Sequence, residues 1–471
     1  MSDDGAIVLA AGRGTRMRST LPKVLHPVAG KPMLVRVLEA LDGAGLPDPA
    51  VVVGYGSDLI RAAAGDRCRY VEQPEQLGTG DAARIGLAAL DQSIRRVLLV
   101  HGDEPLVPAE IYRQMLAVQA ESGAPVLLLT ARVGDTRGFG RVVRDPGGNP
   151  TALVQEIELS NEQRALNEVN LGAYVFDVRF LREQLDRLQP HAPKGEYYLT
   201  DLIAIAAAAG HRVAAITPPD GAEMMGVNDL VQLEAATRMI YRRTNRRLME
   251  SGVTIVDGTG TYIDEDAEIE PDTLIHPFTI IGGRSRIGRG CVIGPSSHIR
   301  DTRIGAGSRI VSSTVEASTL GDAVQVGPYA HLGPGVEIES GVTIGSHSQI
   351  KRSSIGAGSR MHHFGYVGDA RVGRNVNIGA GVVTCNFDGH AKHRTVIEDG
   401  AFIGSDTMLR APVTVGEGGS TGAGAVVIHD VAPGTVVAGI PARVIGKAPE
   451  TAHSDGSGDQ AEAEAQARSG V

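Results

Sequence analysis

Aliphatic residues recur at every sixth position over a long stretch in the second half of the chain. From residue 263 the spacing is kept without a miss at Ile263, Ile269, Ile275, Ile281, Ile287, Ile293 and Ile299. Neither an α-helix, with its period of 3.6 residues, nor an ordinary strand, with its period of two, produces this spacing. A period of six predicts coils of three short strands, each with one aliphatic side chain pointing inward. We therefore expect a left-handed parallel β-helix.

The same spacing continues, after small offsets, almost to the end of the chain. Its later positions are Val326, Leu332, Ile338, Ile344, Ile350, Ile355, Met361, Val367, Val372, Ile378, Ile397, Ile403, Leu409 and Val415. Glycine often follows the aliphatic residue, as in Ile293-Gly294 and Ile403-Gly404. This suits corners where a side chain would collide or where φ is positive. The pattern predicts that residues 253–447 form the β-helix.

The first 226 residues have a different pattern. Apolar runs at 6–10, 50–53, 96–101 and 125–131 alternate with amphipathic stretches, which is typical of an α/β domain with a mostly parallel sheet. Residues 229–250 contain neither proline nor glycine, so we expect a linker helix within 227–252. Residues 448–471 are poor in apolar side chains, which predicts a disordered tail.

Composition narrows the possible partners. The chain has 471 residues and a formal net charge of −10, which argues against nucleic acid or an acidic membrane surface and favours small molecules. Its three cysteines, Cys68, Cys291 and Cys385, lack metal-ligand spacing and suit a reducing compartment. The apolar run near the N-terminus is too short for a signal or membrane segment. We therefore expect a cytoplasmic protein without membrane insertion.

Two loops in the first domain carry candidate chemistry. Gly12-Arg13-Gly14 follows the first predicted strand, where backbone N–H groups can approach a phosphate, and Arg16 and Lys23 supply positive charge. Asp103 follows the strand at 96–101. Because ligands bind outside the carboxyl ends of parallel strands, both loops are expected to face one crevice. Asp103 is then a candidate Mg²⁺ ligand, and a helix-capping aspartate is the alternative.

A second candidate lies within the β-helix, at His362 and His363. A histidine there can accept the proton of an amine that attacks a thioester, because its pKa lies near working pH. One alternative is that both histidines simply face solvent. A zinc site is disfavoured because neighbouring residues of a strand face opposite sides and no third histidine has suitable spacing.

Several motifs together resemble one known family. They are LAAGRGTRM at 9–17, LPK at 21–23, QLGTG at 76–80, GD at 102–103, GFGR at 138–141, EVN at 168–170, GEYYLTD at 195–201, GVN at 226–228 and MHHFGYVGDA at 361–370. The chain is similar, from residue 5 to about 445, to the bacterial bifunctional N-acetylglucosamine-1-phosphate uridylyltransferases and glucosamine-1-phosphate N-acetyltransferases.

The resemblance implies a Rossmann-like nucleotidyltransferase followed by an acetyltransferase β-helix of hexapeptide repeats. It also implies synthesis of UDP-N-acetylglucosamine for the cell envelope from UTP, acetyl-CoA and sugar phosphates, with Mg²⁺ as cofactor, in a homotrimer.

The resemblance further assigns residues to the uridylyl site. Lys23 and Arg16 would act on the triphosphate. The uridine and its phosphates would contact Leu9, Ala10, Ala11, Gly12, Gln73, Gly78, Thr79 and Gly102, and the sugar would contact Gly140, Gln155 and Asn170. Asp103 and Asn228 would ligate Mg²⁺ and contact substrate.

At the acetyl site the resemblance makes His363 the catalytic base. The sugar phosphate would be held by Lys351, Tyr366, Asn377 and Lys392, and acetyl-CoA by Ala380, Asn386, Phe387, Ser405 and Ala423. The segment from Thr384 to Arg394 breaks the six-residue rhythm and is expected to project as a loop that completes a neighbouring site.

The chain departs from the family pattern at several of these positions. His101, Asp81 and Gln155 stand where the family has tyrosine, histidine and glutamate, which predicts altered sugar recognition. Gly333 replaces an arginine and removes a bidentate phosphate clamp. Phe387 and Gln349 replace a tyrosine and a glutamate, and residues 439–443 resemble general hexapeptide acyltransferases.

These departures leave an alternative open, in which a sugar-1-phosphate nucleotidyltransferase carries a β-helix that acetylates a different amine or serves only for trimerisation. The presence of His363, Tyr366 and Asn377 argues against a purely structural β-helix.

Overall fold

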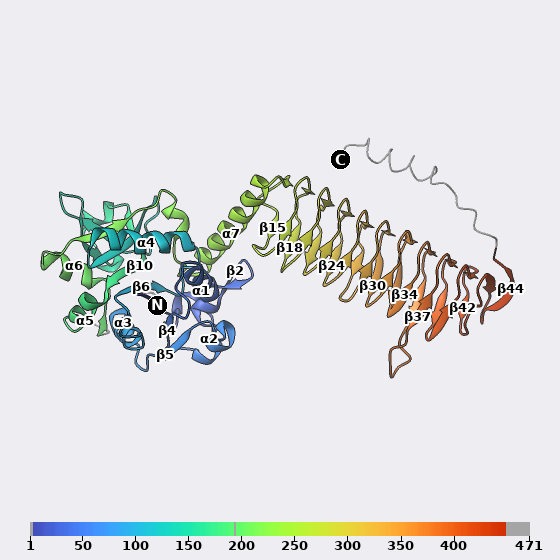
Figure 1. Ribbon diagram of the computed structural model, residues 1–471, viewed down its shortest axis with the longest axis horizontal. Helices are drawn as coiled ribbons and strands as arrows, with labels where there is room; N and C mark the ends of the chain where they lie inside the picture. Colours follow the sequence, from blue (N-terminus) through green and yellow to red (C-terminus); the bar gives the residue numbers. More distant parts are fainter. Residues whose placement is uncertain (1–2, 193–194, 449–471) are drawn as a thin grey trace. The chain divides into compact units, whose positions relative to one another are not determined.

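The computed structural model describes residues 3–192 and 195–448 (Figure 1). The chain divides within one long helix, α7 (Leu230–Glu250), into two compact units, one ending at Ile240 and the other beginning at Tyr241. Helix α7 lies within residues 227–252, where the sequence predicted a linker helix. The expected disordered tail, apart from Ala448, lies outside the described residues.

The N-terminal unit is built on one mostly parallel sheet with strand order β13-β7-β10-β6-β1-β4-β5. The strands are β1 (Asp4–Leu9), β4 (Ala50–Val53), β5 (Arg69–Glu72), β6 (Arg96–His101), β7 (Val126–Arg132), β10 (Glu168–Asp177) and β13 (Val213–Ile216). Only β10 runs antiparallel to its neighbours on this path. A hairpin of β8 (Arg141–Arg144) and β9 (Pro150–Val154) is attached to β10. The apolar runs in the sequence therefore predicted four of these strands correctly.

Helices cover both faces of this sheet. Along β1, Ala6 and Val8 pack into one buried cluster, and Ile7 and Leu9 pack into the other, because successive side chains of a strand point to opposite faces. The first cluster includes residues of α1 (Met33–Gly43), α2 (Ser57–Ala64) and α4 (Ala109–Ser122). The second includes residues of α3 (Thr79–Ala88), α5 (Val178–Leu185) and α6 (Asp201–Ala208). The result is a three-layer α/β/α unit.

Two short hairpins complete this unit: β2 (Pro27–Val28) with β3 (Lys31–Pro32), and β11 (Pro190–His191) with β12 (Glu196–Tyr197). Within residues 3–192 and 195–448, no helix combines the length and the apolar character that crossing a membrane requires.

The second unit is a left-handed β-helix whose parallel strands form three sheets. The first sheet contains β14 (Thr254–Ile255), β17 (Leu274–Ile275), β20 (Val292–Ile293), β23 (Arg309–Ile310), β26 (Gln325–Val326), β29 (Thr343–Ile344), β32 (Arg360–Met361), β35 (Asn377–Ile378), β38 (Phe402–Ile403), β41 (Ser420–Thr421), β43 (Thr435–Ala438) and β44 (Arg443–Lys447). The second contains β15 (Tyr262–Ile263), β18 (Ile280–Gly282), β21 (His298–Arg300), β24 (Thr314–Glu316), β27 (His331–Leu332), β30 (Ser348–Lys351), β33 (Gly365–Gly368), β36 (Val383–Cys385), β39 (Met408–Arg410) and β42 (Val426–Val427). The third contains β16 (Glu268–Ile269), β19 (Arg286–Ile287), β22 (Arg303–Ile304), β25 (Thr319–Leu320), β28 (Glu337–Ile338), β31 (Ser354–Ile355), β34 (Ala370–Val372), β37 (Thr395–Ile397) and β40 (Val413–Val415).

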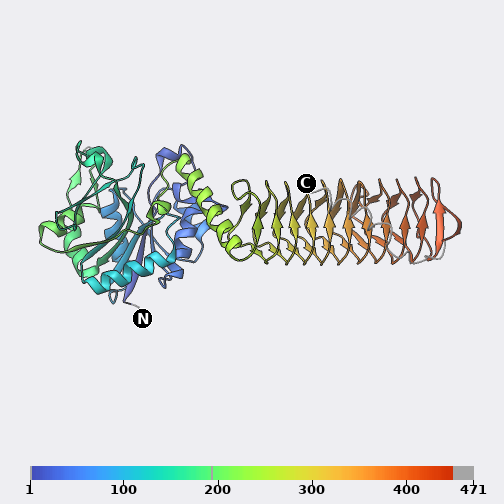
Figure 2. The same cartoon turned by 90° about the horizontal axis from the view of Figure 1, so that it is seen from above.

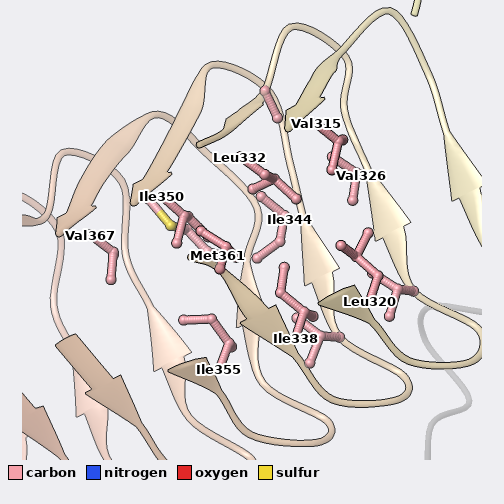
Figure 3. Packing of buried hydrophobic residues seen from close by; sticks show 14 of the residues in the cluster. Val315, Leu320, Val326, Leu332, Ile338, Ile344, Ile350, Ile355, Met361 and Val367 are labelled. Carbon is pink, nitrogen blue, oxygen red and sulfur yellow. The ribbon is translucent and has the colours of Figure 1, made fainter. Parts of the chain in front are cut away.

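The six-residue repeat explains this architecture. Ile263, Ile269 and Ile275 lie on the second, third and first sheets in turn, and Ile281 returns to the second sheet, in register with Ile263. All belong to one continuous buried cluster. Figure 3 shows the corresponding side chains of later coils, such as Ile350, pointing into the interior of the solenoid. Seen from above, the coils follow one another along the solenoid axis (Figure 2).

Both reasons given for the glycines at the corners are found. A Cβ on Gly404 would lie 2.4 Å from the carbonyl oxygen of Thr421 on the next coil, so the close approach excludes a side chain. Gly294 shows the second reason, because its φ is +94°, a value that L-residues rarely adopt.

The solenoid is interrupted at two places. Residues 386–394, between β36 and β37, project from the coil as a loop (Figure 1). At the C-terminal end the direction of the chain reverses, and β44 pairs antiparallel with β43.

Two candidate active sites

The first site is a cleft of about 280 Å³ at the carboxyl ends of the central strands. The loop after β1 is tied to both neighbouring strands, because Ala10 N donates to Val52 O and Gly102 N donates to Leu9 O, each at 2.9 Å. The cleft is lined by Leu9, Ala10, Ala11, Gly12, Gly14, Lys23, Val24, Gln73, Gln76, Gly78, Thr79, Ala82, His101, Asp103 and Glu196. The structure thus brings together most of the residues predicted for the uridylyl site.

The two glycines of the phosphate loop differ in what requires them. Gly14 has a φ of +67°, and a Cβ placed on it would lie 2.4 Å from Lys23 Cβ. Gly12 has no heavy atom within 4 Å of such a Cβ position. Gly14 is therefore needed for the seating of Lys23, whereas Gly12 leaves open space on the cleft.

Lys23 is the point on which three separate segments converge. Its Nζ forms an ion pair with Asp103 and donates to Asn228 Oδ1 at 3.0 Å. Arg16 Nη2 donates to the same oxygen at 2.8 Å. Asn228 is held in turn, since its backbone N–H donates to Gln232 Oε1 at 2.7 Å. Two cationic side chains, the Asp103 carboxylate and the Asn228 amide oxygen thus lie together on one wall of the cleft.

Charge and burial decide the protonation states on this wall. Burial raises the pKa of Asp103, but the charge and the hydrogen bond of the Lys23 ammonium outweigh burial, and the pKa of this carboxyl lies below its ordinary value. Burial lowers the pKa of His101, so its ring is neutral at physiological pH. Asp103 is therefore ionised, and its carboxylate and Asn228 Oδ1 face the same ammonium group.

The nucleotide side of the cleft is ordered by Gln73. Its Nε2 donates to Gly78 O at 3.2 Å and to Asp81 Oδ2 at 2.8 Å. Gly78 has a φ of +98°, and its missing Cβ makes room for the Tyr197 backbone. Asp81, which departs from the family pattern, thus orients a predicted ligand.

The predicted sugar residues also lie together. Asn170 N donates to Gly140 O at 3.1 Å, and a Cβ on Gly140 would lie 4.0 Å from Gln155 Oε1. Asn170 Nδ2 donates to Tyr174 OH at 2.6 Å, whereas Gln155 Nε2 is 3.4 Å from Thr200 Oγ1. Gly140 directly precedes β8, Gln155 directly follows β9 and Asn170 lies on β10, so these residues belong to the hairpin side of the unit.

Behind Asp103 lies Glu104, a carboxyl group to which the sequence assigned no role. It is 6% exposed, and its Oε2 has no hydrogen-bond partner among the described residues. Gly172, in a bulge of β10 with φ of +78°, leaves the space that this carboxyl fills, since a Cβ there would lie 1.7 Å from Glu104 Oε1. Burial and the charge of Asp103 raise the pKa of Glu104 well above its ordinary value.

The second site is a groove of about 430 Å³ on the β-helix, at the turn from the first to the second sheet. Its lining includes His362, His363, Asn377, Ala380, Ser405 and Ala423. The predicted base therefore shares a groove with one predicted sugar-phosphate ligand and three predicted coenzyme ligands. Both histidines line it because they lie in a turn between β32 and β33, where the alternation of a strand does not apply.

The remaining predicted acetyl-site residues lie elsewhere on the coil. Lys351 and Tyr366 are on β30 and β33, and Asn386 Nδ2 is 3.4 Å from Tyr366 OH. Phe387 and Lys392 face each other across the projecting loop. Tyr366 lies on β33, after the turn that holds His363, so the chain presents the predicted ligands in two groups.

Two of the β-helix positions that depart from the family pattern, Gly333 and Gln349, lie beside predicted ligands of the acetyl site. A Cβ on Gly333 would meet Lys351 Cγ at 3.5 Å, an ordinary van der Waals contact, so a side chain can be accommodated there. Gln349 is in register with Tyr366 on the neighbouring strand. Glu196, Arg352 and Asp369 are further residues to which the sequence assigned no role.

Over the described ranges, no group of three or more His, Cys, Asp and Glu side chains could hold a metal ion. The only metal-ligand pair expected from the sequence is Asp103 with the amide oxygen of Asn228.

Comparisons with known proteins agree with this architecture. The family described as MobA-like NTP transferase domain matches residues 6–207, and the bacterial transferase hexapeptide (six repeats) family matches residues 266–301 and 317–352. The bifunctional protein GlmU of Heliobacterium modesticaldum is 45% identical over 431 residues, covering 92% of this chain and 94% of that protein. The bifunctional protein GlmU of Carboxydothermus hydrogenoformans is 44% identical, covering 90% and 95%.

Among solved structures, a UDP-glucose pyrophosphorylase complexed with UDP-glucose is similar to part of the chain. It has a TM-score of 0.43 and 17% sequence identity, and the match covers 51% of this chain and 99% of that one.

Proposed function

Because the chain belongs to the family of bifunctional GlmU proteins, which make UDP-N-acetylglucosamine, we propose how its two units divide that synthesis. The β-helix transfers an acetyl group from acetyl-CoA to glucosamine-1-phosphate. The N-terminal unit then transfers a uridylyl group from UTP to N-acetylglucosamine-1-phosphate and releases pyrophosphate.

The uridylyl transfer is a displacement at phosphorus. A phosphate oxygen of the sugar phosphate attacks the α-phosphorus of UTP in line, and the bond to the pyrophosphate oxygen breaks. Such a reaction needs alignment and charge neutralisation, and no protein nucleophile. Lys23 and Arg16 supply the positive charge, and the glycine loop supplies backbone N–H groups. The observation that carries this assignment is the convergence of Lys23, Asp103 and Asn228 beside that loop.

Mg²⁺ fits the oxygen pair on the same wall. The carboxylate of Asp103 and Oδ1 of Asn228 both face one cation, the Lys23 ammonium, so their oxygens already converge. Oxygen donors are what a hard divalent cation prefers, and when bound it would neutralise the charge of the nucleotide phosphates. We therefore assign Asp103 and Asn228 as its ligands.

For the acetyl transfer, His363 acts as the base. It accepts a proton from the amine as the amine nitrogen forms a bond to the thioester carbonyl carbon. The C–S bond then breaks, and the leaving thiolate takes up the proton from His363, so that coenzyme A leaves as the thiol. Asn377 shares the groove with His363, whereas Lys351 and Tyr366 belong to the other group of ligands. A second copy of the chain would bring its own group opposite the first, and we propose a homotrimer for this reason.

The compartment follows from the substrates. Both reactions consume UTP or acetyl-CoA, which are cytoplasmic metabolites, so we propose that the protein works in the cytoplasm and supplies precursors of the cell envelope.

Two assays on one preparation test the proposal. The wild-type protein is expected to release free thiol from acetyl-CoA with glucosamine-1-phosphate, and pyrophosphate from UTP with N-acetylglucosamine-1-phosphate. Substitution His363→Ala should abolish only the first reaction, and Asp103→Asn or excess EDTA only the second. Loss of both activities in either variant, with the folds intact, would falsify the division between the units.

One observation favours a second candidate function. Gly333 leaves open space beside Lys351 where the family pattern places an arginine, so the phosphate of the acceptor is held less firmly. In this alternative the β-helix acetylates a different amine. Thiol release with another amino sugar, but not with glucosamine-1-phosphate, would select it.

A further inference from the structure

A row of residues in the left-handed backbone conformation runs along the turn after the second β-helix sheet. Asp301, Ala317, Arg352 and Asp369 have φ angles of +48°, +42°, +47° and +49°. Each directly follows a strand of that sheet, namely β21, β24, β30 or β33. Because the strands of this sheet stack in register, the residues after them form a row along the solenoid, to which the coil of β27 contributes none of these four.

Arg352 and Asp369 are neighbours in this row and form a two-pronged ion pair. Arg352 Nε donates to Asp369 Oδ1 at 2.6 Å, and Nη2 donates to Oδ2 at 2.7 Å. The Asp369 backbone is fixed by both adjacent coils, since its N–H donates to Lys351 O and its carbonyl accepts from Thr395 N. The hydrogen bonds from Arg352 lower the pKa of Asp369, so its carboxyl group is ionised at neutral pH.

The next coil places Asn386 beside this carboxylate. Asn386 is 8% exposed, and its Nδ2 donates to Asp369 Oδ2 and lies 3.4 Å from Tyr366 OH. Its backbone carbonyl accepts from His393 N at 2.7 Å, so Asn386 also forms the base of the projecting loop.

The carboxylate decides which way the Asn386 amide faces. An ionised carboxylate only accepts hydrogen bonds, so the amide must turn its NH₂ group toward Asp369. The carbonyl oxygen Oδ1 then points away from the ion pair and keeps its lone pairs for another donor. With a neutral amide at position 369 this constraint disappears, because either end of Asn386 could then find a partner.

We propose that Asp369, held by Arg352, is a positioning residue for acetyl transfer that fixes the Asn386 amide with its Oδ1 directed at the coenzyme. This inference rests on the proposed acetyl transfer and on the expectation, from the family resemblance, that Asn386 contacts acetyl-CoA. The amide N–H groups of the pantetheine arm are donors of the kind that such an oxygen would accept. Arg352 serves by holding the carboxylate in one orientation.

Substitution Asp369→Asn tests the inference in the full-length protein. It should raise KM for acetyl-CoA about tenfold, the effect of losing one oriented hydrogen bond, while kcat and KM for the sugar phosphate change less than about twofold. The matched control is Asp301→Asn, an aspartate of the same row whose Oδ1 accepts from Arg284 N, at 3.0 Å. The control should keep the wild-type KM.

Two further variants separate positioning from folding. Arg352→Lys keeps the charge but not the two-pronged contact, and should raise KM for acetyl-CoA by about threefold. The exchange Asp369→Asn with Asn386→Asp places an acceptor oxygen at position 386 in any rotamer, and should recover most of the lost KM. Equal KM values for Asp369→Asn and wild type, or no recovery in the exchange, overturn the inference.

Failure of the proposed function gives a different result. If wild-type protein transfers no acetyl group, or His363→Ala transfers it normally, the acetyl site itself is wrong. The pyrophosphate assay should be unaffected by every variant in this series, which confirms that the N-terminal unit is folded. Acetyl transfer at the wild-type kcat confirms that the β-helix is folded.

Discussion

Replacing Gly14 with alanine is expected to disable the uridylyl reaction without unfolding the protein. The new Cβ would lie 2.4 Å from Lys23 Cβ, whereas carbon atoms in contact lie about 3.5 Å apart. Lys23 must therefore retreat by about 1 Å, and its ammonium leaves the position beside Asp103 and Asn228. A misplacement of about 1 Å typically costs about 100-fold in rate. We expect kcat for pyrophosphate release to fall by about this factor.

The same substitution also strains the backbone, and this effect needs its own control. Alanine at a φ of +67° costs about 1 to 2 kcal/mol in the left-handed region. Gly45 has a φ of +83° but no heavy atom within 4 Å of a Cβ, so Gly45→Ala imposes the strain without the clash. Both variants should therefore lose a similar amount of stability.

The assay compares pyrophosphate release by Gly14→Ala, Gly45→Ala and wild type, with thiol release as an internal standard for the other unit. The fall in unfolding temperature of Gly14→Ala and Gly45→Ala relative to wild type measures the backbone strain that both substitutions impose. The reasoning is refuted if Gly14→Ala retains the kcat of Gly45→Ala, or if both variants lose uridylyl activity equally.

Three further outcomes follow from the geometry. Gly333→Arg should lower KM for glucosamine-1-phosphate by about tenfold, measured by thiol release, because the site has room for the side chain beside Lys351. An unchanged KM would show that the acceptor phosphate lies elsewhere. Gly172→Ala should destabilise the N-terminal unit by more than about 2 kcal/mol in denaturant titrations, and Glu104→Ala in the same chain should restore part of the loss. Burial and Asp103 raise the pKa of Glu104, so the native state favours the protonated carboxyl; the stability that this proton contributes is full below the ordinary carboxyl pKa and lost as pH rises through the raised pKa. Glu104→Gln should therefore be more stable than wild type at pH 8 but not at pH 4, and a gain of equal size at both values would contradict this assignment.

The repeat pattern was sufficient to predict the β-helix, because the buried residues of a solenoid recur at a fixed short spacing along the sequence. Ile263 and Ile281 lie on adjacent coils and pair directly, as a regular repeat requires. The apolar run at 50–53 coincides with β4, and the run at 96–101 with β6, since strands buried on both faces need continuous apolar sequence.

Contacts between side chains on different coils could not be predicted from the repeat pattern. Ile281 pairs with Ile299, whereas Ile299 pairs with Val315 on a shorter coil. Because coil length changes along the solenoid, counting residues does not tell which side chain lies above Arg352. Its partnership with Asp369 became visible only in three dimensions.

In the first site the sequence predicted which loops carry the functional residues, but not which side chains bond to one another. The pattern identified the glycine loop and Asp103, whereas the bond from Gln73 to Asp81 depends on the turn at Gly78. Asp81 stood out in the sequence only as a departure from the family, and the structure gives it an orienting role.

The reversed strand at the C-terminal end of the solenoid has a consequence for association between molecules. A parallel strand left bare at the end of a sheet is a template to which other chains can add without limit. Here β44 covers β43 in the opposite direction and ends in charged side chains, Arg443 and Lys447, that discourage further addition. A chain truncated before Arg443 would lack β44 and leave β43 uncovered. Its concentrated solutions would be expected to form fibres in which molecules stack end to end.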